Sequence, residues 1–202
     1  MDRQLADEKK RIILGQEIKM ARHLALMVLE KPEPPFWASF IPMVFVFYAQ
    51  KLRQYSSGLE EFAENYLSSR RDALEAATVA KITNTAVDSA KLLDKAGGMP
   101  ETARPIYLKW ITLLTNHYLV LLNSHGACHE ELVRSGYADK AAYLTCCEDV
   151  IEAERAFNLA LLPGVAGDAQ DIFEVVQKMN MAIADLNYHE ADKIFTPDAQ
   201  SP

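Results

Sequence analysis

The feature that most constrains the fold is a run of apolar and small residues that recurs every third or fourth position through the middle of the chain. This alternation is the heptad pattern of a long helix that packs along a partner helix. Ser57 and Glu60 have capping-box spacing before the run, and Gly97 and Gly98 are typical of a helix end after it. The sequence therefore predicts one helix over residues 57–98. The positions of the run are Leu59, Phe62, Tyr66, Ser69, Ala73, Ala76, Ala80, Thr83, Val87 and Ala90.

Apolar residues also recur at helical spacing in four other segments, which cover residues 4–30, 106–135, 139–162 and the stretch after Asp168. Asp139 and Asp168 are candidate N-caps. The pattern predicts an all-α protein, an elongated antiparallel helical bundle of five or six helices. We expect a single domain over residues 1–195 and a disordered tail over residues 196–202. A helix over residues 57–98 would be longer than a compact domain of this size is wide, so we expect a dimer.

Composition narrows the class of protein. Half of the residues are apolar and 24% are charged, which indicates a folded chain rather than a disordered one. The formal net charge of −7 argues against binding to nucleic acid, whose affinity comes from neutralised phosphates. The chain has three cysteines without CxxC spacing, and its first residues mix acids and bases. We therefore expect reduced thiols, no secretory signal and a cytoplasmic location.

The run "PPFWASFIPMVFVFYAQ" over residues 34–50 carries no charged side chain. With Ser39 as N-cap, Pro42 would stand in the first turn of a helix, where its missing N–H costs nothing. Such a helix is apolar nearly all round, so it must bury more than one side. The aromatic segment 36–49 is too short for an unkinked membrane span. The residues expected to contact a partner or a membrane are Phe36, Trp37, Phe40, Phe45, Phe47 and Tyr48.

Three interpretations of this run remain open. Its aromatic side chains can be ordinary core residues of the chain's own bundle. They can instead form an interface with a partner chain, which an exposed patch of this size would normally be. Finally, they can lie at the surface of a membrane, with Lys51 and Arg53 near anionic lipid.

A second group of residues suggests a metal site. His125 and His129 lie one turn apart if the chain is helical there, and Glu17 and Glu154 stand on apolar stripes where leucine is expected. A buried charge usually has a charged partner or a metal. A transition metal held by these four residues is one interpretation. The other is that the two glutamates pair with Arg or Lys at a bundle edge and that His125 is a polar core residue.

The pattern that defines di-metal helical bundles argues against the metal. In those proteins a histidine follows the carboxylate by three residues. Here Met20 and Phe157 hold those positions after Glu17 and Glu154.

Known enzyme motifs do not occur in the chain. There is no GxGxxG, Walker A, GxSxG or HExxH sequence. We therefore expect a non-enzymatic role in binding or assembly, with a second copy or another helical protein as the partner. The alternatives are a metal- or cofactor-binding bundle and a peripheral membrane protein.

Overall fold

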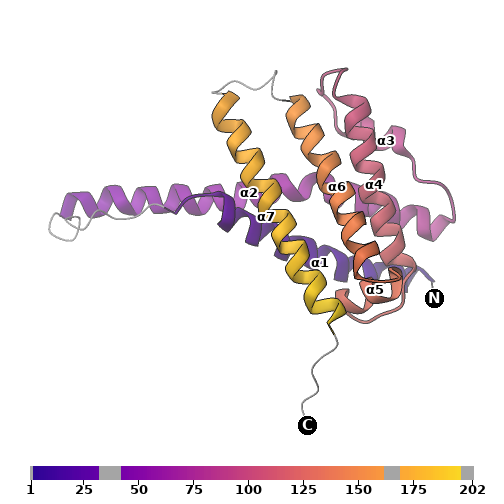
Figure 1. The fold of residues 1–202 in the computed structure, drawn as a ribbon. Coiled ribbons are helices and arrows are strands. Elements are labelled where there is room, and N and C mark those ends of the chain that lie inside the picture. Colours follow the sequence, from indigo (N-terminus) through magenta and orange to yellow (C-terminus); the bar gives the residue numbers. More distant parts are fainter. Residues whose placement is uncertain (1, 32–41, 162–168, 197–202) are drawn as a thin grey trace, which may run out of the picture.

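The computed structural model describes residues 2–31, 42–161 and 169–196, with the backbone alone for residues 2, 42–52 and 169–172 (Figure 1). This part of the chain forms seven α-helices and no strand, so the all-α prediction is confirmed. The number of helices exceeds the predicted five or six. The helices are α1 (Asp2–Val28), α2 (Pro42–Thr83), α3 (Ser89–Lys95), α4 (Arg104–Asn123), α5 (His129–Gly136), α6 (Lys140–Leu161) and α7 (Ala169–Phe195).

The long helices pack in two layers (Figure 1). In the first layer, α1 and α2 run antiparallel, because Lys10 pairs with Glu75 and Glu17 lies beside Arg70. In the second layer, α4, α6 and α7 lie side by side and cross the first layer. The short helices α3 and α5 pack at opposite ends of α4. The bundle is therefore a crossed pair of layers, and its main core lies between them.

Helix α4 is at the centre of this core. Its apolar stripe recurs at steps of three and four, and the five residues of this stripe are all buried: Tyr107, Ile111, Leu114, Tyr118 and Leu121. The ring of Trp110 stacks on that of Phe157 from α6, with 5.4 Å between the ring centroids. The following helix α6 begins after Asp139, whose Oδ1 accepts a hydrogen bond from the Ala142 N–H at 2.8 Å. The predicted cap at Asp139 is thus confirmed. Asp168 and residues 197–202 lie outside the described residues.

Helix α2 joins two predicted helices into one. It begins at Pro42, as expected for a proline in a first turn, and continues through Ser57 without a break for 42 residues. The prediction of a helix start at Ser57 was wrong, because an interior serine costs a helix only a few tenths of a kcal/mol and a helix already formed elongates easily. At about 1.5 Å per residue, α2 is roughly 63 Å long.

The other end of α2 also differs from the prediction. The helix stops at Thr83, and Asn84 follows with a positive φ of 53°, the left-handed conformation that ends many helices. Asp88 then caps α3 by accepting a hydrogen bond from the Lys91 N–H at 3.0 Å. Asparagine tolerates positive φ better than most residues, which is why the heptad pattern does not carry the helix to Gly98.

The predicted helix over residues 106–135 is two helices, α4 and α5. After Asn123 the chain leaves the helical path at Ser124, which has an extended ψ of 167°. At Gly126 the backbone passes so close to α5 that a Cβ atom would lie 2.6 Å from Cβ of Glu131. This tight connection separates His125 from His129, so the two histidines do not share one helix face.

Candidate site between the two helical layers

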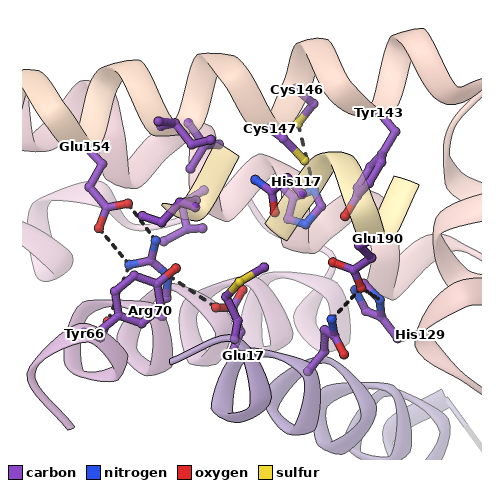
Figure 2. Close-up of a pocket in the computed structure, with 17 residues that line it drawn as sticks. Glu17, Tyr66, Arg70, His117, His129, Tyr143, Cys146, Cys147, Glu154 and Glu190 are labelled. Carbon is purple, nitrogen blue, oxygen red and sulfur yellow. Dashed lines mark hydrogen bonds and ion pairs between the residues drawn. The ribbon is translucent and has the colours of Figure 1, made fainter. Parts of the chain in front are cut away.

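A cavity of about 70 Å³ lies where α1 and α2 cross the second layer (Figure 2). Side chains from six of the helices line it. Five of them are aliphatic or Met side chains, and two clusters of ionisable side chains also face the space. The first cluster is centred on Arg70 of α2, and the second joins His129 of α5 to Glu190 of α7.

Arg70 holds two carboxylates from different helices. Its terminal nitrogens donate to both oxygens of Glu154 at 2.9 and 2.7 Å, and its Nε lies 3.3 Å from Oε2 of Glu17. The guanidinium carbon lies 3.6 Å from the centre of the Tyr66 ring. The side chains of Arg70 and Glu154 are only 5% and 6% exposed, so this bidentate ion pair is shielded from water.

The second carboxylate of this cluster is less favourably placed. Oε1 of Glu17 accepts a hydrogen bond from the Tyr118 hydroxyl at 2.8 Å. Burial nevertheless raises the pKa of Glu17, although Arg70 and Tyr118 oppose the shift. Burial by itself would lower the pKa of Arg70, but Glu154 and Glu17 raise it above its ordinary value, so Arg70 stays charged. The cluster thus carries one fixed positive charge beside two carboxylates.

The second cluster contains a nitrogen without a hydrogen-bond partner. His129 is 9% exposed, and its Nδ1 lies 3.1 Å from Oε1 of Glu190. The alignment of the two groups is not that of a hydrogen bond, and among the described residues this nitrogen has no other partner. Oε1 of Glu190 instead accepts a hydrogen bond from the Gln16 amide of α1. Glu190 is therefore held by a neutral donor, with His129 beside it.

His117 and Cys146 lie in an arrangement that resembles a catalytic pair but lacks its electrostatics. Nδ1 of His117 is 2.5 Å from the Tyr137 hydroxyl and 3.9 Å from Sγ of Cys146. Burial lowers the pKa of His117 to about 3, and burial also raises the pKa of Cys146. Both groups are neutral at pH 7, whereas a nucleophilic cysteine needs a lowered pKa. Burial raises the pKa of the neighbouring Cys147 to about 12.

The structure brings three of the four predicted metal ligands to this cavity. Glu17 and Glu154 both contact Arg70, as the alternative of pairing with an Arg or Lys expects. These contacts lie in the interior of the bundle rather than at its edge. His129 lines the same cavity from its far end. His125 does not reach it, because it is exposed in the connection before α5, where its N–H bonds to Ser135 Oγ. The interpretation of His125 as a polar core residue was therefore wrong.

The four residues do not form one ligand set. Within residues 2–31, 42–161 and 169–196, no group of three His, Cys, Asp or Glu side chains is arranged to hold a metal ion. The two glutamates already accept hydrogen bonds from Arg70 and Tyr118. The transition-metal alternative gains no support from this geometry.

Two residues of the site were missed because they stand in charged stretches. Arg70 is next to Arg71 in "SSRRDALE", which resembles a solvated helix face, yet it follows Tyr66 by four residues and so shares its face. Glu190 follows Leu186 by four residues and continues the apolar stripe of α7. A step of four residues from Tyr66 reaches Arg70, and a step of four from Leu186 reaches Glu190.

A second feature lies where α1 ends beside α2. Gly58 of α2 is next to Leu29, so residues 42–57 of α2 extend beyond the end of α1 (Figure 1). At this point a groove of about 510 Å³ separates the two helices, and we call it the α1–α2 groove. Leu26, which lines the groove, is 57% exposed, and the next residue of α1, Met27, is 50% exposed. The groove is lined by Arg22, Ala25, Leu26, Leu59, Glu60, Ala63 and Glu64.

The predicted contact residues fall at and before this extension. Phe45, Phe47 and Tyr48 belong to the first turns of α2, where the backbone alone is described. Phe36, Trp37 and Phe40 lie outside the described residues. Within the described helices, none combines the length and the apolar character needed to cross a bilayer. The chain was compared with protein-family models, with curated proteins and with solved structures, and none of these comparisons found a significant match.

Proposed function

We propose that this chain acts by protein–protein association through the α1–α2 groove and the adjoining extension of α2, with a second copy of the chain as the partner. The observation that carries the proposal is the groove itself, with the side chain of Leu26 in its lining 57% exposed. The lining combines the apolar Ala25, Leu26, Leu59 and Ala63 with the charged Arg22, Glu60 and Glu64, and apolar surface bordered by charged residues is typical of an interaction site. We propose a binding role, and it agrees with the site: burial lowers the pKa of His117 and raises the pKa of Cys146, so this pair offers no activated nucleophile.

The composition of the extension supports the same surface. Residues 42–49 carry no charged side chain, and they belong to the part of α2 that extends past the end of α1. A helix without a polar face buries more than one of its sides. Because α1 ends beside Gly58, it cannot cover this stretch of α2. In the proposed dimer, a second copy of the chain covers this stretch.

The charge pattern of α2 favours a second copy over an unrelated partner. Lys51 and Arg53 stand before the small residues of "SSG" at positions 56–58, and Glu60 and Glu61 stand after them. If two copies of α2 cross antiparallel at Ser57, Arg53 of each copy lies opposite Glu61 of the other, because both stand four residues from the crossing. Small residues at the crossing allow a close approach of the helices, and the reciprocal charges make the surface complementary to itself.

Light scattering coupled to size exclusion tests this proposal. We expect the wild-type protein to elute with about twice the 22.7 kDa mass of one chain. Leu26→Glu places a charge on the groove and should give the monomer mass. The matched control is Val79→Glu. Val79 is an apolar residue of α2 whose exposed fraction is 48%, and it lies about 30 Å along the helix from Leu59 of the groove. A wild-type protein that is monomeric at 100 µM, or a Leu26→Glu variant that keeps the wild-type mass, would contradict the proposal.

A further inference from the structure

We propose that the cavity between the two layers binds the ammonium group of a small primary amine, with Glu190, Glu17 and His129 as its acceptors. The association proposed above does not enter this inference, because the α1–α2 groove and the cavity share no lining residue. Three observations carry it. They are the charge of the lining, the buried unpartnered nitrogen of His129, and the size and apolar walls of the cavity.

The lining has more carboxylates than cations. Glu17, Glu154 and Glu190 contribute three acidic groups, whereas Arg70 is the one Arg or Lys in the lining. Arg70 forms two hydrogen bonds with Glu154, and its Nε lies 3.3 Å from Oε2 of Glu17, so Glu190 is the carboxylate of the lining that has no Arg or Lys partner within that lining. His117 adds no positive charge at neutral pH, since burial lowers its pKa to about 3. A buried carboxylate without a cation is unfavourable, so a cationic ligand would stabilise this site.

The acceptors also match the donors of an ammonium group in number. An ammonium has three N–H donors and no acceptor. His129 Nδ1 is more than nine-tenths buried without a hydrogen bond among the described residues, and it offers a lone pair when the imidazole is protonated at Nε2. Glu190 and Glu17 offer carboxylate oxygens, each of which can accept more than one hydrogen bond. Because the three residues come from α5, α7 and α1, they can surround a compact cation.

The remaining walls suit a short alkyl chain. The apolar lining residues are Met20, Leu114, Val150, Ile151 and Ile183. The volume of about 70 Å³ is roughly half that of an engineered cavity of about 150 Å³ that binds benzene, so a ligand of about three or four heavy atoms fits. n-Propylammonium has this size and is therefore the probe of choice.

Saturation-transfer NMR with n-propylammonium tests the site, and propan-1-ol at the same concentration serves as the neutral comparison. We expect saturable binding of the amine, at least tenfold weaker binding of the alcohol, and at least tenfold weaker amine binding by Glu190→Gln. Glu75→Gln is the matched control, because Glu75 is an exposed glutamate that pairs with Lys10 on the surface. It should bind the amine as the wild type does.

A variant that keeps every charge guards against misfolding. Val150→Phe fills part of the cavity from α6, and it should also weaken amine binding at least tenfold. If Glu190→Gln does not fold, Val150→Phe decides the question. The proposal is overturned if n-propylammonium shows no saturable binding at 50 mM, if the alcohol binds equally well, or if the folded variants bind as tightly as the wild type. Leu26→Glu should leave amine binding unchanged, which separates this result from a failure of the association proposal.

Discussion

At the scale of single residues, Arg70 links the two layers of the fold. It lies on α2 of the first layer and binds Glu154 on α6 of the second, while its Nε approaches Glu17 on α1. A buried ion pair adds little net stability relative to apolar residues, but removing one partner leaves a buried charge uncompensated. Arg70 therefore specifies how the layers meet, and its loss should be costly.

Arg70→Met should lower the free energy of unfolding by about 3–5 kcal/mol, because Glu154 would remain buried without a cation. Urea denaturation measures this change. The neighbouring substitution Arg71→Met is the control, since Arg71 is 41% exposed and pairs with the exposed Glu64. It should cost less than about 1 kcal/mol. Adding Glu154→Leu to Arg70→Met should recover part of the loss, and equal effects of Arg70→Met and Arg71→Met would refute the account.

His117 should make stability depend on pH. Burial lowers its pKa from an ordinary value of 6.5 to about 3 in the folded protein. Below pH 6.5 the unfolded chain therefore takes up a proton that the folded chain does not. This proton lowers stability as the pH falls from 6.5 toward 3, by up to about 1.4 kcal/mol per pH unit.

The comparison with His117→Gln isolates this contribution, because glutamine can still hydrogen-bond Tyr137 but does not titrate. Glu17 acts in the opposite direction, and equally in the wild type and in His117→Gln. Because its pKa is raised in the folded protein, it contributes stability at low pH that is lost as the pH rises through that raised pKa. Urea unfolding at pH 6.5 and pH 4.5 should show a smaller loss for His117→Gln than for the wild type. Identical losses would show that His117 is not held neutral.

At the scale of elements, close backbone contacts decide where helices stop. A Cβ at Gly126 would lie 2.6 Å from Cβ of Glu131 and 2.8 Å from the Leu132 nitrogen, so this connection between α4 and α5 needs glycine. Gly15, in the middle of α1, has open space around its missing side chain. The same substitution should therefore have opposite effects at the two positions.

Gly126→Ala should destabilise the protein by about 1–3 kcal/mol, because backbone atoms of α5 must shift to admit the methyl group. Gly15→Ala should stabilise it by about 0.5–1 kcal/mol, because alanine restricts the unfolded chain and favours a helix interior. Thermal unfolding of both variants measures the difference. Stabilisation by Gly126→Ala would show that the connection is looser than described.

Helix periodicity predicted most of the elements but not their ends. The stripe of α4 and the cap at Asp139 were found because each is a local pattern of the chain. Two predicted helices form the single helix α2 because a helix that has already formed continues past the capping-box spacing at Ser57. The helix then ends because Asn84 adopts a left-handed conformation. For the site, Glu17 and Glu154 stood out as charges on apolar stripes. Their partner Arg70 did not, because pairing between helices depends on tertiary packing.

At the scale of the whole molecule, the two layers produce two separate features. The cavity and its ionisable groups lie where the layers cross, and the α1–α2 groove lies between the two helices of the first layer, next to the extension of α2 (Figures 1 and 2). The crossing angle of the layers could not be predicted, because a 3.6-residue period gives the buried face of each helix but not the direction of its neighbours. The central claim is that the groove and the extension are covered by a second copy.

Hydrogen–deuterium exchange over a protein concentration series tests that claim most directly. As dimers form, backbone amides of residues 22–28 in α1 and 53–64 in α2 should exchange more slowly, because the partner covers these turns and suppresses their local opening. Amides of α6 serve as the internal reference and should not change. Exchange at residues 22–28 and 53–64 that is the same at every concentration, or protection that appears in α6 instead, would contradict the account.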